Sequence, residues 1–485
     1  MIKNIKLLFL VSLTFIACND DEAPVTYDSS DGLPLTAGTA DFSKYVALGD
    51  SYSAGFSDGA LFIEGQKGSF TNILAQQFAL VGGGNFTTPL MADNFGGLLL
   101  GGTQIQGVRL YFNGKAPVPV TGTPTTDVTK HLSGFFNNMG VPGAKSFHLL
   151  APGYGNTAGV AAGTASPYFS RFSSSTTTTV LADALSQSPT FFSLWIGGND
   201  VLGYALTGGD GTNPITPTAT FNGAYNSIVT QMVAGGRKGV IGNIPYVDAL
   251  PHFRTVPYNP VPLDVATIAQ LMNTTNGYGR YNGGLQVALA NNLITAAEAA
   301  RRTIAFTPGA GNKVVIEDSY LTNLSALGLP SIRQTTVEDL LVLPASSFIG
   351  TSVGGDPTKV NGVSVPLADK WVLSKDEILE IKVATDAYNI IIQTAASTNN
   401  LAFVDLKSLM TELSTTGITA NNFTMNTTFV SGGTFSLDGF HPTPRGYALF
   451  ANKFIEAINI KYGSNLNGVN LGNYRILFPR DAANF

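Results

Sequence analysis

An aspartate three residues ahead of a histidine is the first feature of this chain that points to chemistry. In the DGFH sequence of residues 438–441, the Asp438 carboxylate can fold back onto the His441 imidazole. Such a pair orients a base that takes the proton from a serine hydroxyl during hydrolysis. Taken alone, this spacing also occurs in ordinary surface turns. Three further histidines lack a carboxylate at this spacing and are interpreted as structural: His131, His148 and His252.

Two serines compete for the role of nucleophile. Ser57 lies in the GFSDG sequence of residues 55–59, which matches the G-x-S-x-G turn of α/β-hydrolases, but that turn must follow directly on a strand. The nearest apolar run, residues 45–48, ends just before the GDS sequence of residues 49–51. Ser51 would therefore lie at the carboxyl end of a strand, where open α/β sheets bind ligands. Its own N–H would point into the site from the start of the next helix. We therefore prefer Ser51.

Strands and helices that alternate along the chain would position these residues. Short apolar runs predict buried strands, and amphipathic stretches predict helices. The expected strands are residues 45–48, 190–196, 238–244 and 402–406. The expected helices are residues 69–80, 177–186, 224–234, 376–398 and 444–460. This alternation predicts an α/β protein with a parallel sheet and helices on both faces.

Two regions interrupt the alternation. Residues 81–143 are rich in Gly, Pro and Thr and predict long loops. Residues 251–375 predict an insertion that forms a cap or subdomain, with a helix at about residues 285–302. We expect the insertions to wall the substrate pocket. Four apolar residues of the second region are candidates for an acyl pocket or for a core: Leu341, Val342, Leu343 and Phe348.

Four sequence blocks make the chain resemble the GDSL-type hydrolases, also called SGNH hydrolases after their Ser, Gly, Asn and His residues. The blocks are YVALGDSYSAG at residues 45–55, NMGVPGA at 138–144, WIGGND at 195–200 and DGFH at 438–441. Tyr52 stands where the family has its eponymous Leu, and we expect this change not to touch the chemistry. By itself, the third block could be only a tight turn. The resemblance covers about residues 40–460 and is thin or absent in 60–130 and 251–375.

The resemblance implies a three-layer α/β/α, flavodoxin-like fold and the hydrolysis of carboxylic esters. Ser51 would attack the carbonyl carbon, His441 would accept and return the proton, and Asp438 would fix the imidazole tautomer. The N–H groups of Ser51 and Gly143 and the Asn199 side chain would form the oxyanion hole. Gly140 is the alternative to Gly143. No metal or organic cofactor is implied, because the sequence has no cluster of ligands at metal-binding spacing. The hydrolase domain would span residues 41–462, followed by a tail at 463–485.

The N-terminus resembles that of a bacterial lipoprotein. Two lysines precede an apolar run at residues 7–17, and Cys18, the chain's single cysteine, follows at once. This run is too short to span a membrane. We expect residues 1–17 to be a signal peptide, Cys18 to carry lipid and residues 18–40 to be a flexible tether, with an ordinary secretory signal as the alternative. The acidic residues 20–22 resemble the export signal of Bacteroidota-type lipoproteins, which predicts a lipid anchor in the bacterial envelope, at the outer membrane or cell surface.

Composition limits the class of partner. The chain has 485 residues, of which 44% are apolar and 12% charged, so general disorder is excluded. Its formal charge is −5 and it has no basic run, so we expect no nucleic-acid partner. The substrate would be a small ester, a lipid or an acylated glycan, and membrane contact would come through the lipid anchor. A carbohydrate acetylesterase is one alternative, and a non-catalytic surface binding lipoprotein is the other.

Overall fold

A five-stranded parallel sheet forms the centre of the computed structural model, which describes residues 29, 30 and 32–481. Its strands are β1 (Tyr45–Gly49), β6 (Asn138–Gly140), β7 (Phe191–Trp195), β8 (Lys238–Gly242) and β17 (Ala402–Val404). They lie in the order β17-β8-β7-β1-β6, and each neighbouring pair is parallel. Numbered along the chain, this is the order 2-1-3-4-5 of flavodoxin-like folds. The predicted fold class is confirmed.

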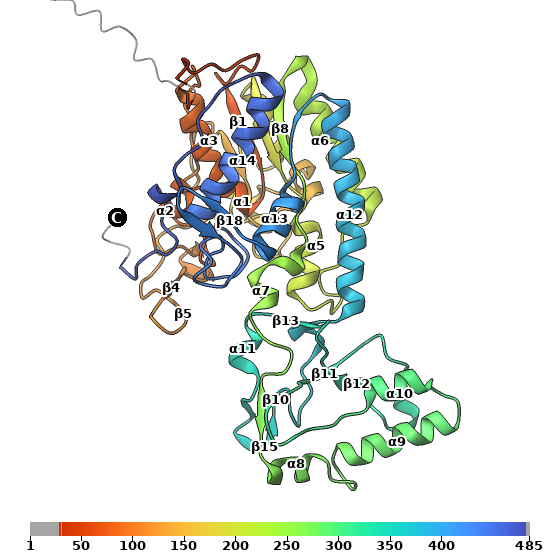
Figure 1. Cartoon of the computed structure of the whole chain (residues 1–485). Helices are drawn as coiled ribbons and strands as arrows, with labels where there is room; N and C mark the ends of the chain where they lie inside the picture. The colour runs from red at the N-terminus through yellow and green to blue at the C-terminus, as the bar shows by residue number, and fades with distance from the viewer. Residues whose placement is uncertain (1–28, 31, 482–485) are drawn as a thin grey trace, which may run out of the picture.

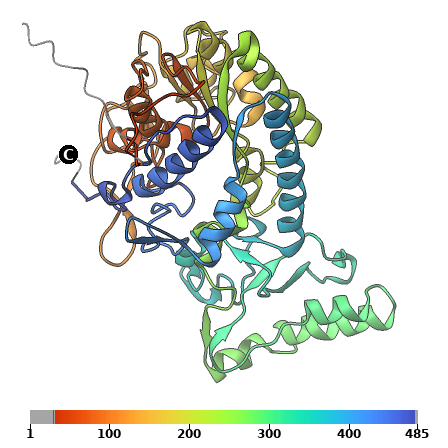
Figure 2. The same ribbon diagram turned by 45° about the horizontal axis from the view of Figure 1, so that its top comes forward.

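Helices cover both faces of the sheet (Figures 1 and 2). On one face lie α3 (Phe70–Ala79) and α14 (Pro444–Tyr462), which contact each other, and α14 also contacts β8 and β17. On the other face lie α4 (Val180–Ser186), α6 (Thr218–Val233) and α12 (Lys375–Thr398), with α12 packed against α6. Shorter helices join these elements: α1 (Ser51–Ala54), α2 (Ile63–Lys67), α5 (Asn199–Leu206), α7 (Pro251–Arg254) and α13 (Leu406–Thr415).

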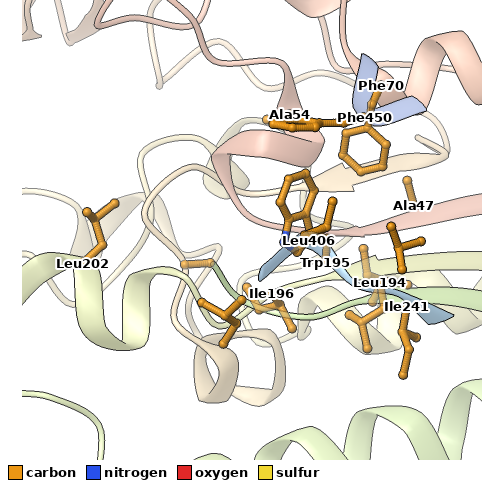
Figure 3. Close-up of a cluster of buried hydrophobic side chains, with 14 of the residues drawn as sticks. Ala47, Ala54, Phe70, Leu194, Trp195, Ile196, Leu202, Ile241, Leu406 and Phe450 are labelled. Atoms are coloured by element: carbon orange, nitrogen blue, oxygen red, sulfur yellow. The ribbon is translucent and has the colours of Figure 1, made fainter. Parts of the chain in front are cut away.

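Aromatic side chains fill the space between the sheet and the helices α3 and α14 (Figure 3). Strand β7, with the sequence FFSLW, is buried along its whole length, as its apolar run predicts. Trp195 at its carboxyl end meets Phe70 of α3 and Phe450 of α14 edge-on, with ring centroids 5.5 Å apart in both pairs. A fully buried aromatic side chain contributes roughly 1.5–3 kcal/mol. This core therefore fixes the end of the sheet at which Ser51 and Asn199 begin their helices.

Residues 81–143 contain more regular structure than the sequence predicts. Two hairpins form there, β2 (Leu98–Leu100) with β3 (Thr103–Gln106), and β4 (Leu110–Phe112) with β5 (Pro117–Pro119). The edge strand β6 follows them, although its sequence, NMG, offers no apolar run. The Asn138 amide anchors this strand by donating to the Ser53 carbonyl oxygen at 2.9 Å and to Thr71 Oγ1 at 3.0 Å. Side-chain hydrogen bonds thus replace the missing hydrophobic signal.

Two other expectations need correction. The helix expected at about residues 285–302 is two helices, α9 (Tyr278–Ala290) and α10 (Ala296–Arg302). The chain turns between them at Asn292, whose φ is +54°, and Thr295 caps α10 by accepting from the Glu298 N–H. Helix α6 begins earlier than expected, at Thr218. The other expected helices and strands are present, with ends that differ by a few residues.

Residues 251–375 form a subdomain that projects from the sheet domain as the lower lobe in Figure 1. Its other elements are β9 (Val261–Leu263), α8 (Val265–Leu271), β10 (Gly309–Asn312), β11 (Val315–Glu317), β12 (Ile332–Gln334), β13 (Leu340–Leu341), α11 (Ala345–Phe348), β14 (Ser352–Val353), β15 (Asp356–Val360) and β16 (Val372–Leu373). It has a hydrophobic core of its own, which includes Leu285 and Ile332. Beside this core the buried Arg333 guanidinium pairs with Asp318 at 2.5 Å and with Asp339 at 2.7 Å.

The four candidate acyl-pocket residues of this region have structural roles. Leu341 and Val342 are buried in the main core, and Phe348 stacks on Trp371 with ring centroids 4.4 Å apart. Leu343 is half-buried beside them. The packing therefore supports a place in the core for these residues rather than in an acyl pocket.

Both ends of the described chain pack on the sheet domain. In the expected tether, the Thr39 N–H donates to the Tyr462 carbonyl oxygen at 2.8 Å, so ordered structure begins before residue 40. In the expected tail, Leu471 and Phe478 are buried. The short hairpin of β18 (Ile418–Ala420) and β19 (Phe423–Met425) precedes α14. No helix in the described part of the chain has the length and hydropathy to cross a membrane.

Candidate active site

Asp438 and His441 form a hydrogen-bonded pair in the loop before α14. Asp438 Oδ2 accepts from His441 Nδ1 at 2.9 Å. The Phe440 and His441 N–H groups donate to Asp438 Oδ1 at 3.0 and 2.9 Å. Burial alone would raise the pKa of Asp438, but the imidazole and these N–H groups outweigh it and hold the pKa below its ordinary value. Asp438 is therefore a carboxylate that favours the tautomer with the proton on Nδ1, which leaves Nε2 as the nitrogen that can accept.

Ser51 is the first residue of α1 and lies at the carboxyl end of β1. The Asp50 carboxylate caps this helix by accepting from the Tyr52 N–H at 3.0 Å, and Gly55 ends it with a φ of +85°. Among the described residues, none hydrogen-bonds to Ser51 Oγ, although Ser51 and His441 line the same cavity. Catalytic hydrogen bonds are often long in unliganded sites and tighten when substrate binds.

Gly143, the preferred oxyanion glycine, also lines this cavity. Its φ is +77°, and its N–H finds no acceptor within the described part of the chain. Gly140, the alternative, has no free N–H and lies in close backbone contact with α1. Its N–H already donates to Asn138 Oδ1 at 3.0 Å, and a Cβ there would stand 2.4 Å from the Ala54 nitrogen. Gly140 therefore serves the close packing of β6 on α1, which leaves Gly143 as the available donor.

Asn199 begins α5 directly after β7 and is a further residue of the cavity wall. Its amide donates one hydrogen bond to the Ala144 carbonyl oxygen at 3.0 Å, and the second amide hydrogen has no partner among the described residues. The next residue, Asp200, accepts from the Ser146 N–H and hydroxyl at 2.8 and 2.9 Å. Residues 197–200 thus form the turn into α5, in which the Asp200 N–H donates to the Gly197 carbonyl oxygen at 3.1 Å, and Asn199 lies in the cavity wall.

The cavity has a volume of about 820 Å³ and opens at the carboxyl ends of β1, β6 and β7. Strands β1 and β7 are the neighbours at which this sheet order reverses, which is where such sheets bind ligands. Its walls come largely from residues 100–106 and 142–168, with the aliphatic side chains of Leu100, Ile105, Val160, Leu202 and Leu206. Among the described residues, no Asp, Glu, Lys or Arg side chain lines it, and its titratable groups are His148, His441 and the phenols of Tyr154 and Tyr168. Residues 251–375 do not line it either, so the expectation that this insertion walls the pocket is wrong.

Ser57 is not a second nucleophile in this arrangement. The residue is 1% exposed, and its hydroxyl donates to the Pro442 carbonyl oxygen at 3.0 Å. It is absent from the cavity wall. Of the two candidate serines, only Ser51 is open to a ligand in the cavity.

Two of the remaining histidines hold chain segments together. His252 Nδ1 lies 2.9 Å from the Asp438 carbonyl oxygen, and His131 Nδ1 lies 3.2 Å from that of Ser170. His148 is different, because it lines the cavity while its Nδ1 accepts from the Lys145 N–H at 3.0 Å. Burial, with the nearby Lys145 charge, lowers the pKa of His148 to about 4, so the ring is neutral near pH 7. A purely structural interpretation of His148 is therefore incomplete.

Tyr52 and Phe56 contact the histidine, which the sequence interpretation missed. The Tyr52 hydroxyl donates to the Phe440 carbonyl oxygen at 2.9 Å, and its ring stacks on Trp195. The Phe56 and His441 rings have centroids 4.4 Å apart. Tyr52 thus holds the residue before His441, and whether its presence in place of the family's leucine affects the chemistry stays a prediction. Its place directly after Ser51 was the available signal, whereas nothing local in the sequence links Phe56 to His441.

Cys18, the expected lipid attachment site, lies outside the described residues, as do residues 1–17. Within residues 29, 30 and 32–481, no group of three or more His, Cys, Asp or Glu side chains is arranged to hold a metal ion.

Comparisons with known proteins add little to this geometry. The chain matches no protein-family profile and no curated protein. It is similar to one solved structure, the crystal structure of LAE5, an alpha/beta hydrolase enzyme from the metagenome of Lake Arreo, Spain, at 10% sequence identity and a TM-score of 0.33. The alignment covers 87% of this chain and 96% of that one. A similarity at this TM-score does not establish a shared fold. The fold is therefore assigned from the order of the strands, and the candidate site from the contacts between its own residues.

Proposed function

We propose that this chain is a serine hydrolase of carboxylic esters, of the SGNH type that its four sequence blocks resemble. One observation carries the proposal. His441, which is hydrogen-bonded to Asp438, lines a cavity together with Ser51, Gly143 and Asn199, at the sheet edge where such folds bind ligands. Each group that serine hydrolysis requires is thus available at one place. A binding protein would need no such combination of groups.

In the proposed mechanism, Ser51 Oγ attacks the ester carbonyl carbon while His441 Nε2 accepts the hydroxyl proton. His441 then gives this proton to the leaving alcohol, and the acyl group remains on Ser51. A water molecule then loses a proton to Nε2 and attacks the acyl carbon, and His441 returns that proton to Ser51 Oγ as the carboxylic acid leaves. Asp438 stabilises the imidazolium through its bond to Nδ1, and its lowered pKa keeps it charged throughout.

The negative charge of the tetrahedral intermediate would be held by three donors. Two are the backbone N–H groups of Ser51 and Gly143, and the third is the free hydrogen of the Asn199 amide. The hydrogen bond from Asn199 to the Ala144 carbonyl oxygen supports this assignment, because it fixes the amide beside the Gly143 loop before substrate arrives. Donors fixed in advance stabilise developing charge most effectively.

The lining of the cavity favours an uncharged ester with a sizeable apolar part. Aliphatic side chains such as Leu100, Ile105 and Val160 offer no polar atom to the hydroxyl groups of a sugar, and they form one part of a lining that also includes Gln106, Thr164 and Ser166. A volume of about 820 Å³ is within the range of pockets that enclose small-molecule ligands. We therefore propose acyl esters, including lipids, ahead of acetylated glycans.

Reaction with a fluorophosphonate probe tests the proposed function. The folded protein should be labelled once, the labelled peptide should contain Ser51, and heating beforehand should prevent the reaction. The Ser51→Ala variant should remain unlabelled. Labelling at Ser57, or a folded protein that hydrolyses esters without reacting at Ser51, would contradict the proposal.

We also propose that the enzyme is held in a bacterial envelope by lipid on Cys18. The apolar run of residues 7–17 before the single cysteine supports this anchor. A lipid anchor would keep the cavity close to a membrane surface, which suits an ester with an apolar part.

A further inference from the structure

The GFSDG sequence of residues 55–59 resembles a nucleophile elbow, yet the proposed mechanism gives its serine no role. We propose that this segment, the 55–59 turn, positions the Asp438–His441 pair relative to Ser51, and that Asp58 is its central positioning residue. The inference rests on the proposed function of that pair. The turn follows α1 directly and contacts a loop 379 residues further along the chain. It thus links the helix of the nucleophile to the loop of the base.

The turn reaches both carboxylate oxygens of Asp438, one directly and the other through Ser436. The Gly59 N–H donates at 2.8 Å to Oδ2, the oxygen that also binds His441 Nδ1. On the other side, the Asp58 N–H donates to Ser436 Oγ at 2.9 Å, and Ser436 Oγ donates to Asp438 Oδ1 at 3.2 Å. Movement of the turn would therefore move the carboxylate that orients the imidazole.

The Asp58 side chain holds the same loop from a second direction. Its Oδ1 accepts from the Leu437 N–H at 3.0 Å, whereas its buried Oδ2 has no partner among the described residues. Asp58 also has a φ of +52°, a left-handed conformation that is uncommon outside glycine. Strained or unsatisfied groups of this kind persist where the surrounding structure needs them, often at functional sites. Here the carboxyl group serves the loop that carries the base.

Phe56 extends the contact to the imidazole itself. Its ring lies against the His441 ring, and the Tyr447 hydroxyl fixes its backbone by donating to the Phe56 carbonyl oxygen at 2.7 Å. With the bond from Ser57 Oγ to the Pro442 carbonyl oxygen, the turn also contacts His441 and the residue that follows it.

The loop depends on such external contacts for its position. Its internal bonds, from the Ser436 N–H to the His441 carbonyl oxygen and from the Gly439 N–H to that of Ser436, are 2.8 and 2.9 Å long. They preserve the shape of the loop, and with it the Asp438–His441 pair, but not its distance from Ser51. Because a displacement of about 1 Å at a catalytic group costs up to about 10²-fold in rate, loss of the turn contacts should lower kcat more than it changes KM.

Three variants test the inference on the full chain, with kcat and KM for an aryl ester measured on protein titrated with a fluorophosphonate. Asp58→Gly removes the carboxyl group and suits a φ of +52°. We expect its kcat to fall about tenfold or more, with KM within about twofold of wild type. Asp58→Asn keeps an oxygen that accepts from the Leu437 N–H, so its kcat should stay within about twofold of wild type.

Asp183→Ala is the matched control, because it removes a buried carboxylate that accepts from the Ser174 N–H at 2.9 Å elsewhere in the fold. It should lower Tm without lowering kcat.

A folded Asp58→Gly variant with wild-type kcat would overturn the inference, as would an Asp58→Asn variant no more active than Asp58→Gly. If Asp58→Gly does not fold, Ser436→Ala tests the inference instead. This variant removes only the Ser436 hydroxyl, through which the Asp58 N–H is connected to Asp438 Oδ1. Its kcat should fall at least about threefold, and an unchanged kcat would equally overturn the inference. An inactive Ser51→Ala beside a fully active Asp58→Gly would reject this inference alone, whereas an active Ser51→Ala would reject the proposed function.

Discussion

The Tyr52 hydroxyl donates to the carbonyl oxygen of Phe440 at 2.9 Å, so the residue after the proposed nucleophile holds the residue before the proposed base. The Tyr52 ring also stacks on Trp195 at a centroid distance of 4.8 Å and meets the His441 ring edge-on at 5.7 Å. A leucine at this position, as in the family that the chain resembles, could make neither the hydrogen bond nor the aromatic stack. The substitution therefore brings a contact of its own to this site.

Removal of the Tyr52 hydroxyl should loosen that contact. Tyr52→Phe keeps the stack on Trp195 but leaves the Phe440 carbonyl oxygen without its donor, which should cost about 1 kcal/mol of stability. We expect kcat to fall severalfold while KM changes little. Tyr278→Phe is the matched control, because its buried hydroxyl donates to the Val363 carbonyl oxygen at 2.7 Å in the 251–375 subdomain. If both variants lose only stability, Tyr52 has no role in positioning His441.

The oxyanion assignment makes a larger prediction. Asn199→Ala should lower kcat by roughly 10² to 10³ with little change in KM, because its amide would act on charge that exists only in the transition state. Some stability should be lost as well, since the bond to the Ala144 carbonyl oxygen disappears. Asn389→Ala, which removes a buried amide that binds Ile244 backbone groups away from the cavity, should lower Tm alone. An unchanged kcat with a lowered Tm in Asn199→Ala would remove Asn199 from the site.

The buried Asp50 should make stability depend on pH. Burial raises the pKa of Asp50 to about 7, and the charge of nearby Asp200 adds to the effect. In the unfolded chain the pKa is about 3.9, so between these values the folded state binds more protons. Its contribution to stability is therefore complete below about pH 4 and is lost as pH rises through about 7.

Asp50→Asn isolates this effect, because the amide still accepts from the Tyr52 N–H but does not ionise. Relative to wild type, the free energy of unfolding of this variant should rise between about pH 4.5 and about pH 8, by on the order of 1 kcal/mol per pH unit at most, and its Tm should rise with it. Thermal melts across this range measure the difference. The same difference at both ends of the range would show that Asp50 does not titrate in this way.

The anchor prediction concerns residues outside the described part of the chain. Wild-type protein expressed in a bacterium with lipoprotein machinery should fractionate with membranes and carry lipid on Cys18, as read from the mass of its N-terminal peptide. Cys18→Ala should be soluble or remain unprocessed. Stable anchoring requires more than one acyl chain, so the mass should show several. Soluble, unlipidated wild-type protein would contradict the lipoprotein interpretation.

Much of the sheet could be predicted because its strands are buried on both faces. The apolar runs that contain β1, β7 and β8 are visible without any knowledge of their neighbours. The edge strand β6 could not be found in this way, because its three residues are held by the Asn138 side chain rather than by an apolar run. A local apolar pattern therefore indicates a buried strand, but it gives no signal for a strand that side-chain hydrogen bonds hold in place.

The candidate site also has a part that local sequence patterns predict and a part that they do not. Ser51, Asn199 and His441 follow from short motifs, and the sheet topology brings the segments that carry them to one cavity. The partners of those residues come from distant parts of the chain. The contact between Gly59 and Asp438 joins residues 379 apart, and the cavity wall at residues 142–168 has no regular pattern. Such contacts depend on the assembled tertiary structure, which single-sequence patterns do not encode.

The comparison of Ser51→Ala with Ser57→Ala, measured as kcat on an aryl ester, tests the central claim most directly. Both serines lie in motifs that suit a nucleophile, but only Ser51 lines the cavity with His441. Ser51→Ala should abolish turnover, while Ser57→Ala, which loses one hydrogen bond to the Pro442 carbonyl oxygen, should keep most of its activity. Full activity in Ser51→Ala together with its loss in Ser57→Ala would contradict the account.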